Sequence, residues 1–221
     1  NEGRLYVAAS GGNMMRQETK RPATMTVLLG FFVIMLDTTI VNVSLAHIAK
    51  DLHGTTASLQ WIIDAYTLSF AALLLSAGTA CDRLGAQRIY LFGLILFALF
   101  SIACALSPSM EILISARALQ GVGAAMVVPS SLALISEMYS DHKERAKIIG
   151  LWGAAGGIAA ALGPIIGGAL VSTTGWRAAF WVNIPIIGVL AILTISFIPR
   201  WVPQASNSFD VLGQITSIIS L

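Results

Sequence analysis

The chain has 221 residues, of which 56% are apolar and only 11% are Asp, Glu, Lys or Arg. Soluble domains carry about 25% charged residues, so this composition excludes an ordinary soluble domain and favours a protein surrounded by lipid. The formal net charge is +2, and the basic residues are spread thinly over predicted loops rather than gathered in a patch. We therefore expect no nucleic-acid partner.

Six apolar segments are long enough to cross a bilayer. A hydrocarbon core about 30 Å thick needs about 20 apolar residues in a helix, and a backbone in lipid must satisfy its own hydrogen bonds. In chain order the segments are 26–45, 59–80, 89–107, 112–136, 148–172 and 178–198. The sequence predicts an all-α integral membrane protein in which residues 26–198 form a six-helix bundle with antiparallel neighbours.

The flanking residues are predicted to lie outside this bundle. We expect residues 1–25 to form an irregular cytoplasmic tail and the polar residues 199–209 to form a cytoplasmic linker. Residues 210–221 begin a seventh apolar run that stops after about ten residues, too few to span. We therefore expect the chain to be a fragment that lacks a C-terminal half, with the native start at Met14 or Met15.

The basic residues predict the orientation. With the N-terminus placed in the cytoplasm, ten of the 13 Lys and Arg residues fall on the cytoplasmic side. Lys50 and Arg177 fall outside, and Arg117 lies within a span. Because cytoplasmic loops carry an excess of Lys and Arg, we expect a multi-pass protein of the plasma (cytoplasmic) membrane with its N-terminus in the cytoplasm.

Three charged residues lie within predicted spans: Asp37, Asp64 and Arg117. Charges at membrane depth are expensive, so each is a candidate functional residue. At about 1.5 Å per residue, Asp37 lies near the bilayer midplane and Arg117 at a similar depth.

Asp37 and Asp64 are candidates for carrying a proton or binding a cation, because a poorly hydrated cavity favours the neutral form of a carboxyl group. Arg117 would act as a fixed positive charge beside a carboxylate. A structural ion pair between Asp37 and Arg117 is the alternative, and the two interpretations are compatible. The uncharged polar residues at or near the spans are predicted first as interhelical hydrogen-bonding groups and second as substrate ligands: Asn42, Gln60, Gln120 and Asn183.

Residues 78–88 (GTACDRLGAQR) connect the second and third predicted spans. We expect a tight cytoplasmic turn in which Gly78 and Gly85 allow close backbone approach. The turn carries an acid, Asp82, within a basic cluster of Arg83 and Arg88. A generic positive loop is the alternative to a gating role.

The fifth predicted span is rich in glycine. Small residues four apart predict close helix packing, and Pro164 predicts a bend because proline lacks a backbone donor. Plain helix packing is the alternative to a hinge and seal for alternating access. The residues concerned are Gly153, Gly157, Gly163, Pro164, Gly167 and Gly168.

These stretches resemble motifs of the major facilitator superfamily. Residues 78–88 are similar to its signature loop, with matches at Gly78, Asp82, Arg83, Gly85 and, one place later, Arg88. They depart from it at Ala80, Cys81, Ala86 and Gln87. Residues 36–45, 61–68, 117–125, 153–168 and 176–185 resemble motifs of its fourteen-helix drug:proton antiporters, in order and over roughly residues 25 to 200.

The resemblance implies the N-terminal six-helix bundle of that fold, a 3+3 inverted repeat, followed by the start of a seventh helix. It also implies proton-coupled antiport that exports hydrophobic, cationic drugs by alternating access. Asp37, Asp64 and Arg117 would serve proton coupling and substrate binding, residues 78–88 would gate, and the proton gradient would supply energy without a cofactor. Such a half is expected to be inactive alone, and a transporter of a different small metabolite is the alternative.

An integral-membrane enzyme is a third hypothesis, and the sequence argues against it. His47, His53 and His142 all fall in predicted loops. The sequence contains no HExxH, GxSxG or phosphate-binding loop, which are the usual motifs of such catalytic sites. We therefore expect neither an enzyme nor a metal site.

Overall fold

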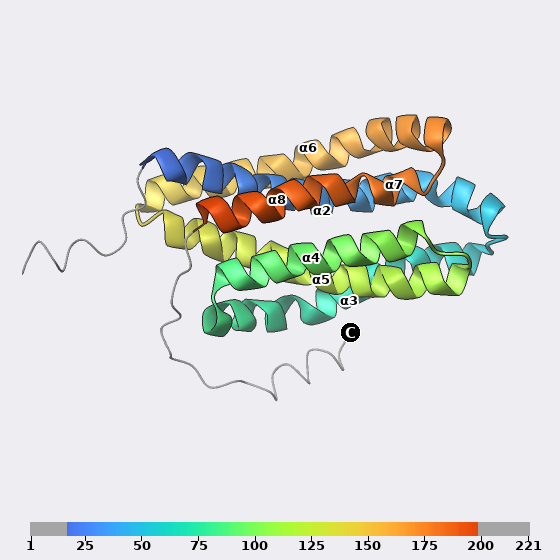
Figure 1. The fold of residues 1–221 in the computed structure, drawn as a ribbon, viewed down its shortest axis with the longest axis horizontal. Helices are drawn as coiled ribbons and strands as arrows, with labels where there is room; N and C mark the ends of the chain where they lie inside the picture. The colour runs from blue at the N-terminus through green and yellow to red at the C-terminus, as the bar shows by residue number, and fades with distance from the viewer. Residues whose placement is uncertain (1–16, 199–221) are drawn as a thin grey trace, which may run out of the picture.

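The computed structural model describes residues 17–198, and all regular structure within them is helical (Figure 1). Six helices of this part are long and apolar enough to cross a membrane, as predicted, with α7 and α8 together forming the sixth span. The chain is therefore a multi-pass membrane protein. The helices are α2 (Gln17–Asp51), α3 (Thr56–Leu84), α4 (Ala86–Ala105), α5 (Met110–Met138), α6 (His142–Thr174), α7 (Ala178–Trp181) and α8 (Asn183–Phe197).

Four helices, α2, α3, α5 and α6, extend beyond the predicted apolar segments at both ends, whereas α4 and α8 end slightly before the predicted ends at 107 and 198. Because α2 begins at Gln17, residues 17–25 are helical instead of belonging to an irregular tail. Contacts with the far end of α5 explain this extension, since the hydroxyls of Thr24 and Tyr139 lie 2.8 Å apart and Lys20 Nζ lies 5.2 Å from the centre of the Tyr139 ring. The predictions for residues 1–16, the linker 199–209 and the seventh helix 210–221 lie outside the described residues.

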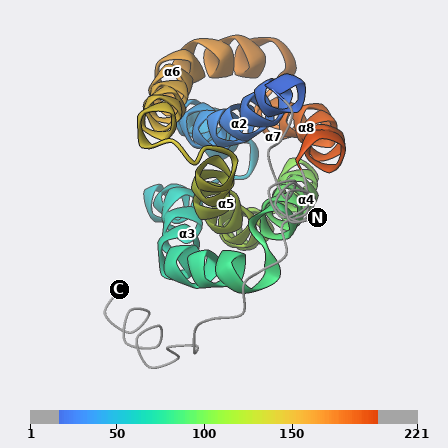
Figure 2. The ribbon, with the colours of Figure 1, turned by 90° about the vertical axis from the view of Figure 1, so that its left-hand side faces the viewer.

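The six spans are buried to very different degrees, in a pattern that repeats. The shares of buried residues are 61% for α2, 17% for α3 and 44% for α4, then 61% for α5, 22% for α6 and 33% for the α7–α8 span. In Figure 2, α2 and α5 lie between α6 and α3, while α4 and α8 lie together on one side. The same order of burial in each group of three agrees with the predicted 3+3 repeat.

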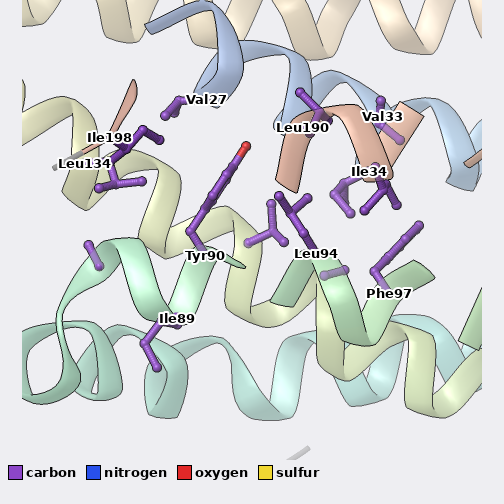
Figure 3. Close-up of a cluster of buried hydrophobic side chains, with 14 of the residues drawn as sticks. Val27, Val33, Ile34, Ile89, Tyr90, Leu94, Phe97, Leu134, Leu190 and Ile198 are labelled. Carbon is purple, nitrogen blue, oxygen red and sulfur yellow. The ribbon is translucent and has the colours of Figure 1, made fainter. Parts of the chain in front are cut away.

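A core of apolar side chains fills the space between α2, α4, α5 and α8 (Figure 3). Leu94, Phe97 and Leu134 are fully buried in it. Tyr90 points from α4 towards α2, where its hydroxyl donates to the carbonyl oxygen of Thr26 at 2.9 Å. Gly30 leaves room for this hydroxyl, because a Cβ at that position would overlap it.

The basic residues gather at one end of the bundle. The N-terminus of α2, the α3–α4 junction, the N-terminus of α6 and the C-terminus of α8 meet at that end (Figure 1). Its basic residues within the described chain are Lys20, Arg21, Arg83, Arg88, Lys143, Arg145 and Lys147. Lys50 and Arg177 lie at the opposite end, so the asymmetry predicted from the sequence is preserved in three dimensions.

Candidate functional site

A fully buried carboxylate lies in the middle of the bundle. Asp37 of α2 has no exposed surface and accepts hydrogen bonds from three side chains. Its Oδ2 accepts from Arg117 Nη1 at 2.8 Å. Its Oδ1 accepts from Asn183 Nδ2 at 2.6 Å and from Gln120 Nε2 at 3.2 Å. The carboxylate therefore joins α2, α5 and α8, and all its partners are donors suited to the ionised form.

Arg117 is the buried cation of the cluster, with 2% of its surface exposed. Besides Asp37, its Nη1 donates to Gln120 Oε1 at 2.7 Å and its Nε donates to the Ile62 carbonyl oxygen at 3.4 Å. Its Cζ lies 4.1 Å from the centre of the Tyr66 ring. Two of these contacts come from α3, so the arginine links α5 to both α2 and α3.

Ser101 of α4 completes the cluster. Its hydroxyl oxygen accepts from Gln120 Nε2 at 2.8 Å and from Asn183 Nδ2 at 3.3 Å. The ion pair and the hydrogen-bonding roles of Gln120 and Asn183 agree with the sequence analysis. Tyr66 and Ser101 were not predicted, because an uncharged tyrosine or serine in a span carries no signal that separates a site residue from ordinary packing.

Local features of the chain bring these side chains together. Gly121, one turn after Arg117, lies against the Tyr66 backbone, and a Cβ there would overlap the Tyr66 carbonyl oxygen. Asn183 lies at the break between α7 and α8. Pro185 has no N–H to donate to the carbonyl of Trp181 four residues earlier, which favours a break at this place.

The buried ion pair is also a contact between two helices, since Asp37 belongs to α2 and Arg117 to α5. A proton bound at Asp37 Oδ2 would face a guanidinium group that can only donate hydrogen bonds. Protonation there would remove the negative charge that Arg117 faces and would weaken the Asp37–Arg117 contact. A change of one charge at this site would thus alter a contact between α2 and α5.

Asp64 lies outside this cluster. It is partly exposed on α3, and its Oδ1 accepts from Gln60 Nε2 at 2.9 Å within the same helix. The structure therefore separates the two predicted carboxylates, with Asp37 in the core and Asp64 on a face of α3. Gln60 forms this bond within one helix and Asn42 is exposed, so neither is an interhelical partner in this part of the chain.

The predicted turn at residues 78–88 is almost entirely helical. α3 continues to Leu84 and α4 begins at Ala86, so Gly85 alone connects them, with φ of 91°. This conformation suits glycine and strains other residues. Asp82, Arg83 and Arg88 are exposed. Within the described residues no atom lies within 4 Å of a Cβ built at Gly78, so the close approach predicted there is wrong for this part of the chain.

The glycines of α6 divide into two groups. Gly163 and Gly167 pack on α2, where added Cβ atoms would meet Thr39 and Ile40. Gly153, Gly157 and Gly168 have no atom of the described chain within 4 Å of that position. The predicted close packing is therefore confirmed at Gly163 and Gly167 only. α6 runs through Pro164 without ending, and Pro164 is exposed.

A second ion pair, which the sequence analysis missed, lies at the end of the bundle opposite the basic end. Asp51 Oδ2 accepts from Arg177 Nη1 at 2.6 Å and from Trp176 Nε1 at 2.9 Å. The two charged side chains, Asp51 and Arg177, are partly exposed, so this ion pair adds little to the stability of the protein,. It connects the end of α2 to the turn before α7.

Two of the three histidines lie in helices instead of the predicted loops. His47 lies within α2 and His142 is the first residue of α6, while His53 lies in a turn with φ of 52°. Among residues 17–198 no three His, Cys, Asp or Glu side chains are grouped so as to hold a metal ion.

Comparison with known proteins identifies the family. The model of the Major Facilitator Superfamily matches residues 27–219. A methylenomycin A resistance protein of Bacillus subtilis (strain 168) is 40% identical over 193 residues, which are 87% of this chain and 41% of that protein. The multidrug resistance protein Stp of Mycobacterium tuberculosis (strain CDC 1551 / Oshkosh) is 41% identical over 87% of this chain and 36% of its own. The chain thus spans about two fifths of the length of these relatives.

Solved structures share the fold at low sequence identity. A peptide transporter POT in complex with sulfate aligns with a TM-score of 0.73 at 15% identity, over 90% of this chain and 43% of its own. A bacterial homologue of the human lysosomal transporter Spinster, in an inward-facing and unoccupied conformation, aligns with a TM-score of 0.72 at 19% identity, over 89% and 47%.

Proposed function

The chain belongs to the major facilitator superfamily, and we propose that it is the N-terminal half of a proton-coupled antiporter that exports hydrophobic, cationic compounds by alternating access. The relatives named for methylenomycin A resistance and multidrug resistance support export of toxic compounds. The observation that carries the proposal is Asp37, a fully buried carboxylate held by donors from α5 and α8. Buried ionisable residues in spans mark ion and proton pathways.

Protonation of Asp37 is the proposed coupling step. A proton from the outside adds to Asp37 Oδ2, the carboxyl group becomes neutral, and the Arg117 contact opens. The same proton leaves Asp37 on the cytoplasmic side, and Asp37 pairs again with Arg117. Each proton would thus open and close the Asp37–Arg117 contact once. This change would shift the equilibrium between the two orientations of the bundle, and the proton gradient supplies the energy without a cofactor.

Asp64 is the proposed contact for a cationic substrate. It lies on a partly exposed face of α3 together with other polar groups, Gln60 and Thr67. A carboxylate on such a face attracts a cation at a distance from the Asp37 site. Proton and substrate would therefore bind to different carboxylates of the same half.

The exposed faces of the bundle differ in chemistry, which supports an assignment of their neighbours. α4 and α8 expose large apolar side chains suited to lipid: Phe92, Ile95, Leu99, Val189, Ile192 and Ile195. α3 and α6 are the least buried spans and expose Asp64 and the unpacked glycines Gly153 and Gly157. We infer that a second half of the protein packs on α3 and α6, with Gly78 and the exposed Asp82 at its cytoplasmic edge acting as a gate.

The basic end of the bundle supports the proposed orientation. Cytoplasmic ends of membrane proteins are rich in Lys and Arg, so the end with the α3–α4 junction faces the cytoplasm, and so does the N-terminus of α2. The proposed location is the plasma (cytoplasmic) membrane.

Ethidium efflux from energised cells that carry the complete protein tests the proposed function. We expect efflux above that of cells without the protein, and we expect a protonophore to abolish it. An absence of efflux for ethidium and other cationic dyes, with the protein present in the membrane, would contradict the proposal and favour transport of a different small metabolite.

A further inference from the structure

Tyr66 of α3 has a buried hydroxyl group without a hydrogen-bond partner among the described residues. Its side chain is 4% exposed. A buried polar group without a partner costs stability and needs an explanation. The Tyr66 ring, by contrast, lies against the Arg117 guanidinium at 4.1 Å, well within the distance of a cation–π contact,. The ring rather than the hydroxyl therefore makes the polar contact of this residue in the present state.

α3 holds Arg117 at two points one helical turn apart. The Ile62 carbonyl oxygen accepts from Arg117 Nε at 3.4 Å, and the Tyr66 ring covers the guanidinium. Residues four apart lie on the same face of a helix. Gly121 of α5 allows this face to pack closely, since any side chain there would overlap the Tyr66 backbone. The sequence thus places an aromatic ring where α3 meets the buried cation.

The contacts of α3 with Arg117 matter most when Asp37 is neutral. The charged groups that act on Tyr66 are Asp37 of α2 and Arg117 of α5. When Asp37 is protonated, Arg117 loses its counter-charge and keeps only Gln120, the Ile62 carbonyl oxygen and the Tyr66 ring. A buried cation without a partner is strongly unfavourable, so these remaining contacts, two of which come from α3, then stabilise Arg117.

This inference rests on the proposed protonation of Asp37. We propose that Tyr66 is a positioning residue that holds Arg117 when Asp37 is protonated, and that it thereby transmits the charge state of Asp37 to α3. α3 is the least buried span and carries Asp64, two residues before Tyr66. Tyr66 therefore links the proton site to the helix that bears the proposed cation-binding carboxylate.

Hydrogen exchange of α3 amides in the complete protein tests this link without a substrate. The variants are Asp37→Asn, which mimics the neutral carboxyl group, Tyr66→Leu, and the two combined. Phe70→Leu is the matched control, because Phe70 is an aromatic residue of the same helix that stacks on Tyr66 at 6.4 Å between ring centres. We expect Tyr66→Leu to accelerate exchange near residue 66 about tenfold in the Asp37→Asn background, which corresponds to about 1.4 kcal/mol. With Asp37 unchanged, we expect Tyr66→Leu to accelerate exchange by a clearly smaller factor. We expect Phe70→Leu to have the same effect in both backgrounds, since it loses only its own packing.

Further outcomes separate this inference from the proposed function. If Tyr66→Leu and Phe70→Leu act alike in both backgrounds, the inference about Tyr66 is wrong even where ethidium efflux depends on the proton gradient. If wild-type efflux is independent of the gradient, the proposed function fails, while the exchange experiment still reports on Tyr66. Tyr66→Phe keeps an aromatic face of the same size, so we expect it to resemble wild type. A loss in Tyr66→Phe as large as that in Tyr66→Leu would contradict a role for the ring.

Discussion

At the scale of single residues, burial decides which charged groups form a cluster. Asp37 and Arg117 are both almost completely inaccessible and pair directly, whereas Asp64 is partly exposed and, among residues 17–198, bonds to a neighbour in its own helix. A charge far from water needs several partners, and a charge near water needs fewer. The three charged residues within the predicted spans therefore lie in different environments despite their similar cost in lipid.

Removal of Arg117 is expected to destabilise the protein strongly. Arg117→Met leaves the Asp37 carboxylate buried without its cation, and breaking a buried pair in this way costs about 3–5 kcal/mol. The combined variant Asp37→Asn/Arg117→Met removes both charges and is expected to recover part of that loss. Thermal unfolding of the purified complete protein measures both. Equal stabilities of Arg117→Met and the combined variant would contradict the expected recovery.

Neutralisation of Asp64 is expected to affect substrate affinity rather than stability. Asp64→Asn keeps the size of a partly exposed side chain, so the free energy of unfolding should change by about 0.5 kcal/mol or less. We expect binding of ethidium to weaken about tenfold, equivalent to about 1.4 kcal/mol, and binding of an uncharged hydrophobic compound to stay unchanged. Fluorescence titration checks both, with Gln60→Ala as a control that retains the carboxylate. Equal weakening for both compounds would argue against a charge contact.

At the scale of helices, the glycines of α6 lie on two different faces of that helix. Gly163 and Gly167 face α2, while Gly153 and Gly157 face open space in the described chain. The spacing of small residues predicts close packing but does not indicate which partner is packed. That information depends on the rotation of α6 about its axis, which neighbouring helices determine.

Two leucine substitutions in α6 separate these faces. Gly163→Leu is expected to push α6 from α2 and to destabilise the bundle by about 1–3 kcal/mol, because the Thr39 side chain occupies the required space,. Gly153→Leu is the matched variant, with no atom of the described chain in its way. We expect Gly153→Leu to reach the membrane in normal amounts and to lose transport where a second half packs on this face. Normal transport by Gly153→Leu would place that half elsewhere.

Sequence predicted the spans well and their ends less well. Hydropathy reports which residues lie in lipid, so all six spans were found. Helix ends depend on local hydrogen bonds and turn conformations, such as the contact of Thr24 with Tyr139 and the positive φ of Gly85, which hydropathy does not register. For the same reason the loop expected over residues 78–88 reduces to one glycine.

The charged residues of the buried cluster could be found from the sequence, whereas its members Ser101 and Tyr66 could not. Asp37 and Arg117 stand out in any sequence because charges in lipid are costly. Ser101 and Tyr66 do not, since their contribution depends on the face they present and on helices far away in the chain. The pairing could be proposed from depth alone, but the links to α3 and α4 required the packed bundle.

At the scale of the whole molecule, the described helices form one six-span bundle. The fold is that of the major facilitator superfamily, and the chain spans about two fifths of its drug-resistance relatives. Its apolar α4–α8 side suits lipid, and its open α3–α6 side suits a second half. The buried ion pair joins α2, in the first group of three spans, to α5, in the second group.

Proton movement driven by substrate shows whether Asp37 couples the proton to export. Liposomes that contain the complete protein and an internal pH indicator are given an ethidium gradient, with no imposed pH difference and with the membrane potential clamped. We expect proton movement opposite to ethidium for the wild-type protein and its loss in Asp37→Asn, with ethidium binding retained. Equal proton movement in the wild-type protein and in Asp37→Asn would contradict the assignment of Asp37 as the coupling carboxylate.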